Sequence, residues 1–407
     1  MQILTLTLTL VMVVLKAAGS FPDSVKYSAV NIWPMPLNVT IPKDVTGPRG
    51  LSENFEIVTR SCSRIESLAH ELVDLTKQTI FRGPLRSYQE SAYATLHNAT
   101  CELSMRCLSD DECESHTFCF VPSDERWSRN GSACSPVSTL GYSAKCGCCV
   151  DQKSFRSIQS LIVICDSTDG DDESHTIDVN STSIVLKSST ATGAARGLAT
   201  ISQLLRYDTD KDVLIMDVVP LKIFDEPLYV WRGVMIDTAR HFVPHDDILR
   251  LIDGMYAGKL NKLHIHATDS TAWTLRSDAY PELAEEGSWS RSSATFYSKS
   301  DIQSIIQRGQ ERFVDVLFEL DTPAHTLSVS RSHPEMMAQC WEWLATSGFK
   351  VDVDSDDTIS LNPVNTQARN MVRTVLQEIA ELSFSPYVRS MKHHTRCRFL
   401  GAHTHTS

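Results

Sequence analysis

The sequence predicts an α/β protein in two parts: a small α+β domain, then about the first half of a (β/α)8 barrel of the TIM type. At 407 residues the chain is longer than one typical domain. From Trp231 onward, strand-like and helix-like segments alternate, which is typical of a parallel sheet or a (β/α)8 barrel. The preceding part lacks this regular alternation. The net charge of -12 argues against a nucleic-acid partner.

The first twenty residues read MQILTLTLTLVMVVLKAAGS. They are apolar from Ile3 to Leu15 and end in small residues, so residues 1–20 predict a cleaved secretory signal peptide. No other segment is apolar enough to predict a membrane span. Asn-x-Ser/Thr triplets, which predict glycosylation, occur at Asn38, Asn98, Asn130 and Asn180. These features favour the secretory pathway, with an extracellular or lysosome-like destination.

Residues 21–225 form the predicted α+β domain. Apolar residues between Ile65 and Leu72 recur at helical spacing. Two strand-like stretches follow at 157–167 and 175–189, the second divided by a turn at Asn180. The segment 191–206 reads ATGAARGLATISQLLR and predicts a helix.

A cysteine-rich insert at about 100–150 interrupts this domain. It contains eight of the twelve cysteines: Cys101, Cys107, Cys113, Cys119, Cys134, Cys146, Cys148 and Cys149. In a secreted chain this density favours a disulfide module, whose connectivity the sequence leaves open. Zinc is the weaker alternative, because no matched pair of C-x-x-C motifs is present.

Residues 226–387 form the predicted half-barrel. Strands are expected at 231–237, 261–267 and 312–321, and a fourth begins at 386–388. Helices are expected around 248–255, 302–306 and 368–382. The first three strands all end in ionisable residues: Asp237 and Arg240; His264, His266 and Asp269; Glu319, Asp321 and His325. Three such ends on one rim favour a polar pocket.

Two kinds of chemistry fit this rim. His264-x-His266 could hold the metal of a barrel hydrolase. The pair lies within the second strand, however, where histidines bonded to neighbouring carboxylates are common, and we expect no metal and no cofactor. The alternative is glycoside cleavage, which needs charged groups that hold sugar hydroxyls and a positioned acid.

The motifs WRGVMIDTARHFVP, LNKLHIHATDS and FELDTPAHT, in this order, resemble those of the β-N-acetylhexosaminidases of glycoside hydrolase family 20. The resemblance extends to NIWPMPL, GAARGLATISQLL, DAYPELAEEGSW and ISLNPVN. It implies a hydrolase that releases terminal N-acetylglucosamine or N-acetylgalactosamine from glycans, glycoconjugates or chitin oligomers. The family mechanism is retaining and substrate-assisted. The resemblance also allows a homodimer.

The resemblance implies a role for each rim residue. Arg240 would bind hydroxyls of the terminal sugar, with Asp237 beside it. Asp269 and His325 would form a supporting pair that hydrogen-bonds towards the catalytic acid. His266, Glu319 and Asp321 would support the pocket from below.

The family places its catalytic aspartate and glutamate in an H-x-G-G-D-E motif after the fourth strand. Here the chain reads RSMKHHTRCRFLGAHTHTS from Arg389, and no GGDE occurs. We therefore interpret 388–407 as an aberrant tail, from a frame shift, mis-splicing or a degenerate gene copy, and question the activity of this chain. The stretch GDDE at 170–173 predicts a solvated loop. The alternative function is a secreted glycan-binding protein without catalysis.

Overall fold

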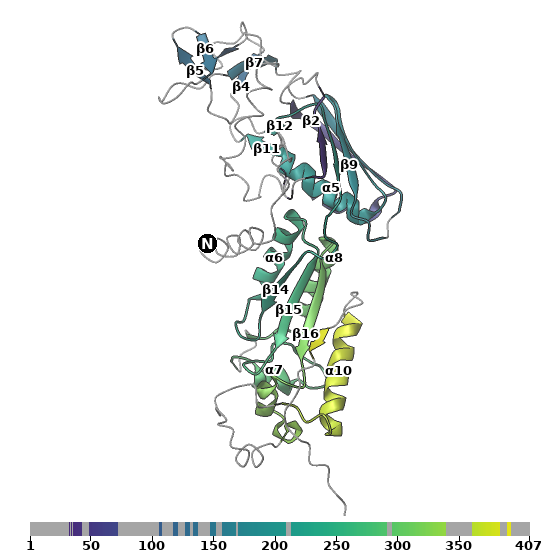
Figure 1. Cartoon of the computed structure of the whole chain (residues 1–407), viewed down its shortest axis with the longest axis vertical. Helices are drawn as coiled ribbons and strands as arrows, with labels where there is room; N and C mark the ends of the chain where they lie inside the picture. Colours follow the sequence, from purple (N-terminus) through teal and green to yellow (C-terminus); the bar gives the residue numbers. More distant parts are fainter. Residues whose placement is uncertain are drawn as a thin grey trace, which may run out of the picture.

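The structure is a computed structural model, which describes residues 32, 34, 36–42, 49–71, 157–167, 170–207, 213–290, 295–338 and 360–382 with their side chains. It describes the backbone alone of 208 and of the short strands at 106–107, 117–120, 127–130, 133–136, 147–151 and 389–391. The predicted signal peptide, Asn98 and most of the predicted tail lie outside the described residues. Figure 1 shows two layered parts joined along the chain.

The first part is an eight-stranded mixed sheet with the strand order β1-β13-β9-β10-β8-β2-β12-β11. Its strands are β1 (Asn38–Thr40), β2 (Arg49–Arg60), β8 (Ile158–Cys165), β9 (His175–Val179), β10 (Ser183–Ser188), β11 (Leu205–Asp208), β12 (Val213–Met216) and β13 (Leu221–Asp225). The expected strands at 157–167 and 175–189 are confirmed as β8 and the β9–β10 hairpin. The sheet is larger than the sequence predicts, because β1, β2, β11, β12 and β13 are not among the predicted strands, and Leu205 and Arg206, predicted as helix, begin β11.

Helix α5 (Ala191–Leu204) packs against this sheet, as the motif ATGAARGLATISQLL predicts (Figure 1). Its small residues allow a very close approach. A Cβ on Gly197 would lie 2.2 Å from a methyl carbon of Leu186 on β10, and one on Gly193 would lie 2.5 Å from the Ser174 carbonyl oxygen. The two glycines are therefore required by packing.

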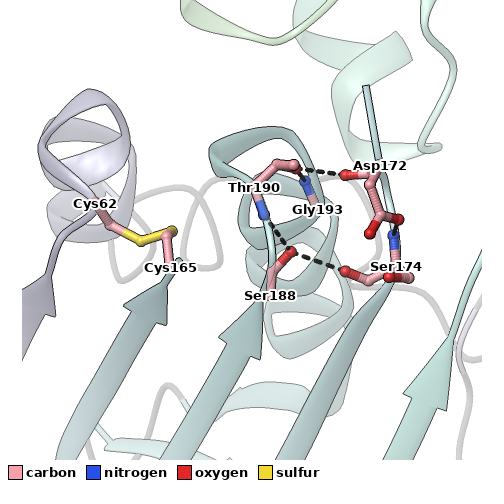
Figure 2. Close-up of a disulfide and its surroundings, with 7 residues drawn as sticks. All are labelled: Cys62, Cys165, Asp172, Ser174, Ser188, Thr190 and Gly193. Atoms are coloured by element: carbon pink, nitrogen blue, oxygen red, sulfur yellow. Dashed lines mark hydrogen bonds between the residues drawn. A yellow bond between two sulfur atoms is a disulfide. The ribbon is translucent and has the colours of Figure 1, made fainter. Parts of the chain in front are cut away.

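The amino end of α5 is held by hydrogen bonds to the loop before β9 (Figure 2). The Thr190 hydroxyl accepts a hydrogen bond from Gly193 N at 3.0 Å and donates to the Asp172 carbonyl oxygen. The Ser188 hydroxyl donates to the Ser174 carbonyl oxygen at 2.8 Å. These contacts cap the helix and fix the loop 170–174 against it.

A disulfide joins Cys62 to Cys165 at the carboxyl ends of the parallel neighbours β2 and β8 (Figure 2). Cys62 directly precedes η1 (Ser63–Ile65), and helical structure continues to residue 71, as the spacing of Ile65 predicts. The two cysteines are 103 residues apart in sequence, and the cysteine-rich insert at about 100–150 lies in the loop between them.

The insert has its own small sheets. A three-stranded sheet has the order β3 (Arg106–Cys107), β7 (Gly147–Asp151), β4 (Thr117–Phe120), and β5 (Trp127–Asn130) pairs with β6 (Ala133–Pro136). The expected disulfides of the insert concern side chains outside the described set, so they stay a prediction.

The second part is a four-stranded parallel sheet in sequential order, with strands β14 (Gly233–Asp237), β15 (Lys262–Thr268), β16 (Asp315–Asp321) and β17 (Arg389–Met391). The helices are α6 (His245–Ala257), α7 (Glu282–Gly287), α8 (Lys299–Glu311) and α10 (Thr366–Leu382), and two short 3-10 turns are η6 (Leu327–Arg331) and η7 (Pro334–Met336). This alternation confirms the predicted α/β class and matches half of a (β/α)8 barrel. The fourth strand starts at Arg389 and not at 386–388, so it falls in the segment we interpreted as tail.

The two faces of this sheet differ sharply. Alternate residues of a strand point to opposite faces. One face packs against α6, α8 and α10 and contributes Leu263, Ile265, Val316, Phe318 and Leu320 to a continuous apolar core. The opposite face therefore carries the polar set His264, His266, Glu319 and Asp321.

Glu173 joins the two parts of the molecule, which corrects the prediction of a solvated GDDE loop. Its side chain is 7% exposed and accepts a hydrogen bond from Arg196 Nε of α5 at 2.6 Å. It also accepts one from Asn261 Nδ2 at 2.9 Å and pairs with Arg232. Burial alone would raise the pKa of Glu173, but Arg196 and Arg232 lower it below its usual value.

Further charged contacts extend this interface. Lys259, at the end of α6, donates to Asp225 at 2.7 Å and is 5% exposed. Arg312, after α8, reaches Glu71 at 2.9 Å and Asp253 at 2.8 Å. Because buried charges are stable only when paired, these contacts fix the first domain to the amino-terminal end of the parallel sheet.

Among the helices that the structure describes, none is long and apolar enough to cross a bilayer.

Candidate active site

The predicted rim residues meet at the carboxyl end of the parallel sheet. Strand register aligns Asp237, His266 and Glu319 in one row across β14, β15 and β16. The row continues to the backbone of Arg389 on β17. In (β/α)8 folds this end of the strands carries the chemistry, so the row defines the floor of the candidate site.

Arg240 is anchored by two carboxylates while half of its side chain remains accessible. Its Nη1 lies 2.6 Å from Asp237 Oδ2, and its Nη2 lies 2.7 Å from Asp269 Oδ2. Its backbone N–H also donates to Asp237 Oδ1 at 2.9 Å. Burial opposes the charge, but the combined effect of Asp237 and Asp269 outweighs it and raises the pKa of Arg240. With 54% of its side chain exposed, the guanidinium can offer further donors to a polar ligand.

His266 links Asp269 to Glu319. Its Nε2 lies 2.9 Å from Asp269 Oδ2, and its Nδ1 lies 3.2 Å from Glu319 Oε2. The same Glu319 oxygen lies 2.5 Å from His264 Nε2. The expected support of the site by His266 and Glu319 thus takes the form of a chain of contacts that runs from Arg240 through Asp269 and His266 to Glu319.

These contacts determine the charge of His266 and Asp269. Burial disfavours a charged imidazole, yet the hydrogen bonds to Asp269 and Glu319 outweigh it and raise the pKa of His266 to about 9. Burial likewise opposes ionisation of Asp269, but His266 and Arg240 lower the pKa of Asp269 below its usual value. At neutral pH the pair is therefore imidazolium and carboxylate.

We expect this charge to appear in the pH dependence of stability. The folded pKa of His266 is raised, so its contribution is complete below about pH 6.5 and is lost as the pH rises through about 9. The difference in free energy of unfolding between the wild type and His266→Gln should shrink across this interval in urea titrations. An NMR titration of the wild type should place the imidazole pKa near 9; a value near 6.5 would contradict the prediction.

His325 pairs with a different carboxylate from the one expected. Its Nδ1 lies 2.6 Å from Asp321 Oδ2 and 3.9 Å from Asp269 Oδ2. His325 adopts a positive φ of 54° in the loop after β16, and its ring lies back against Asp321 of its own strand. The predicted Asp269–His325 pair is thus two pairs, His266–Asp269 and His325–Asp321, side by side.

His266, Asp269 and Asp321 also form a potential metal-ligand group, since one atom of each lies within 4.8 Å of the others. The donor chemistry disfavours a cation there. Asp269 Oδ2 already holds Arg240 and His266, and a protonated imidazole cannot ligate. The H-x-H pair is directed to Glu319 instead, and the absence of a metal stays a prediction.

Several hydrogen bonds in and around the rim were not predicted from the sequence. Ser328 donates to the Asp269 carbonyl oxygen at 2.7 Å, and Thr268 Oγ1 accepts from Asp321 N at 3.0 Å. Trp289 donates its indole N–H to the Ala239 carbonyl oxygen at 2.8 Å. Thr268 ends β15, Trp289 lies in the loop between β15 and α8, and Ser328 lies in η6 after β16, and isolated hydroxyl or indole groups of this kind give no periodic signal in sequence.

The predicted glycosylation sites fall on accessible positions where the structure describes them. Asn38 lies exposed on the edge strand β1, and Asn180 lies exposed in the turn between β9 and β10. Asn130 is on β5, where the backbone alone is described. Both exposed positions are compatible with the attachment of a glycan.

Two family models match this chain. The model described as "Glycosyl hydrolase family 20, catalytic domain" matches residues 229–390, and the one described as "beta-acetyl hexosaminidase like" matches residues 32–204. The match to the catalytic domain contains every rim residue discussed above. The other covers most of the eight-stranded sheet and α5.

Curated relatives give the same result. The chain is 33% identical over 219 residues to beta-hexosaminidase subunit beta of Entamoeba histolytica, covering 54% of this chain and 38% of the relative. It is 34% identical over 211 residues to beta-hexosaminidase subunit beta of Homo sapiens, covering 52% and 36% respectively. The chain therefore spans less than two fifths of these relatives.

Solved structures support the fold. A family 20 exo-β-N-acetylglucosaminidase from Vibrio harveyi, in complex with N-acetylglucosamine, aligns with 91% of this chain and 47% of its own, at a TM-score of 0.59 and 18% identity. The β-N-acetylhexosaminidase of Streptomyces coelicolor aligns with 89% and 59%, at 0.57 and 19% identity. This likeness shows the fold, and the matched models with the curated relatives identify residues 229–390 as part of a catalytic domain of glycosyl hydrolase family 20.

Proposed function

We propose that this chain functions as a β-N-acetylhexosaminidase, which releases terminal N-acetylglucosamine or N-acetylgalactosamine from glycans, glycoconjugates or chitin oligomers. The observation that carries the proposal is Arg240. It is held by Asp237 and Asp269 at the rim, yet keeps more than half of its side chain accessible. A fixed guanidinium can donate to two adjacent sugar hydroxyls without losing rotamer freedom on binding.

The remaining rim residues prepare the site. Asp269 carries the negative charge that orients Arg240, and His266 neutralises it from below. Asp321 fixes the ring of His325 through Nδ1, so that its Nε2 can orient a neighbouring acid. In the retaining mechanism proposed here, the acetamido group of the substrate attacks the anomeric carbon while an acid protonates the leaving oxygen. The described residues would bind and orient, and the family's H-x-G-G-D-E motif is not in the sequence.

A second candidate is glycan binding without catalysis. It is favoured by the same observation, a fixed Arg240 that keeps more than half of its side chain accessible. The two functions share the sugar site and differ only in turnover.

Arg240→Ala tests the shared site. Hydrogen bonds from a charged donor contribute about 1.5–3 kcal/mol, so the affinity for N-acetylglucosamine should fall about 10- to 100-fold. Calorimetry or saturation-transfer NMR on the full chain would measure it. Arg250→Ala is the matched control, since Arg250 is an exposed α6 residue paired with Asp247. Equal affinities of the wild type and Arg240→Ala would refute the site.

Hydrolysis separates the two candidates. If the wild-type chain releases the aryl group from an aryl N-acetylglucosaminide at a rate that Arg240→Ala lowers, it is a hydrolase. If it binds the sugar but leaves the aryl glycoside intact, the glycan-binding function stands.

The compartment and assembly remain proposals as well. We propose the secretory pathway, with an extracellular or lysosome-like destination, which the 1–20 segment, the cysteine-rich insert and the exposed Asn38 and Asn180 support. A homodimer is the proposed assembly by family resemblance.

A further inference from the structure

Trp289 is an exposed aromatic residue fixed beside the proposed sugar site. It lies in the loop after α7, between β15 and α8, on the side of the sheet where the strands end. Its side chain is among the exposed large hydrophobics, with 48% of the residue accessible. Its indole N–H donates to the carbonyl oxygen of Ala239, the residue before Arg240. One edge of the ring is therefore attached to the turn that carries Arg240.

The loop that presents Trp289 is itself held in place. Arg331, at the end of η6, donates from Nη1 to the carbonyl oxygens of Gly287 and Ser288 at 3.1 and 3.2 Å. Its Nη2 donates to the Thr271 carbonyl oxygen at 3.0 Å. Gly287 also accepts a hydrogen bond from Trp273 N at 3.0 Å. The ring is thus preorganised, so that a ligand can bind it at little entropic cost.

The exposed surface of this indole is apolar, because its only polar atom is already bonded to Ala239. A β-linked N-acetylglucosamine residue has its hydroxyls in the equatorial plane and C–H groups on its faces, so it can stack on such a ring. We propose that Trp289 forms a second subsite, which binds the sugar next to the terminal residue held by Arg240. This rests on the proposed function and narrows it to chito-oligosaccharides and glycans with a β-linked penultimate N-acetylglucosamine.

Trp231 provides a matched control at the other end of the sheet. It is 55% exposed and precedes β14, where the strands begin. Lys262 Nζ lies 5.4 Å from the centre of its ring. Trp231 thus has the same residue type and a similar exposure, far along the strands from Arg240.

The test compares N-acetylglucosamine with chitobiose as ligands of the full-length wild type, Trp289→Ala and Trp231→Ala. A stacking contact corresponds to about a 5-fold change in affinity. We expect chitobiose to bind the wild type about 5-fold more tightly than the monosaccharide, and Trp289→Ala to lose this gain while its monosaccharide affinity stays within about twofold. Trp231→Ala should keep the gain, and Trp289→Tyr should retain most of it.

Two results would overturn the subsite while leaving the proposed function in place. If Trp289→Ala keeps the chitobiose gain, the ring does not contact the second sugar. If it weakens both ligands equally, the ring shapes the first site instead. If the wild type binds neither sugar, the proposed function itself fails and the subsite fails with it, which sets that outcome apart from the other two.

Discussion

Replacing Glu173 by Gln is expected to lower the free energy of unfolding by about 3–5 kcal/mol, the usual cost of breaking a buried ion pair by removing one partner. The neutral side chain would leave Arg196, which is 2% exposed, and Arg232 without their shared carboxylate. Gln has one acceptor oxygen where the carboxylate has two, so it cannot accept from both arginines and from Asn261 in the same arrangement. Chemical denaturation with a tryptophan fluorescence readout measures the change.

Asp171→Asn is the control for the Glu173 variant. It makes the same change of charge two residues away, at a position that is exposed. We expect it to alter the free energy of unfolding by less than about 0.5 kcal/mol, as most surface substitutions do. If Glu173→Gln cost no more than this control, the network would not hold the two domains together.

Removing the Cys62–Cys165 disulfide should cost about 4–5 kcal/mol. The bridge closes a loop of 103 residues, and the chain-entropy model assigns about this much to a loop of such length. Cys62 and Cys165 are 1% and 3% exposed, so Ala is the appropriate replacement. The measurement is the free energy of unfolding of Cys62→Ala, Cys165→Ala and the double variant.

Comparing the two single variants with the double variant tests whether the loss of stability comes from the disulfide. Either single substitution already removes the bridge, so the double variant should be close to each single one and well short of their sum. Additive losses would mean that the two sulfurs contribute through packing alone.

The periodic features of this chain were predictable from the sequence, and the pairings of its polar groups were not. Alternating apolar residues identified β15, β16 and the helices between them, since such patterns are set within one element. Strand ends also placed Asp237, Asp269 and Asp321 on one rim. Which carboxylate His325 takes, however, is settled in a loop where this residue has a positive φ, and the sequence gives no direct guide to it.

Glu173 illustrates a second reason why polar contacts could not be predicted from the sequence. Among Gly170, Asp171 and Asp172 it looks like part of a solvated loop, and its neighbours in sequence are indeed exposed. Its three partners, Arg196, Arg232 and Asn261, lie between 23 and 88 residues further along the chain. A contact over such separations depends on how the two domains pack, which no local pattern encodes.

The long connection between β2 and β8 affects how the native disulfide can form while the chain is being synthesised. These neighbouring strands are separated by the whole cysteine-rich insert, and synthesis proceeds from the amino terminus. In an oxidising compartment Cys62 therefore meets eight cysteines, from Cys101 to Cys149, before its native partner Cys165 exists. Any bridge that Cys62 formed with one of these cysteines would be non-native and would have to be exchanged. We therefore expect thiol–disulfide isomerisation to speed the oxidation of this protein once β8 has joined the sheet.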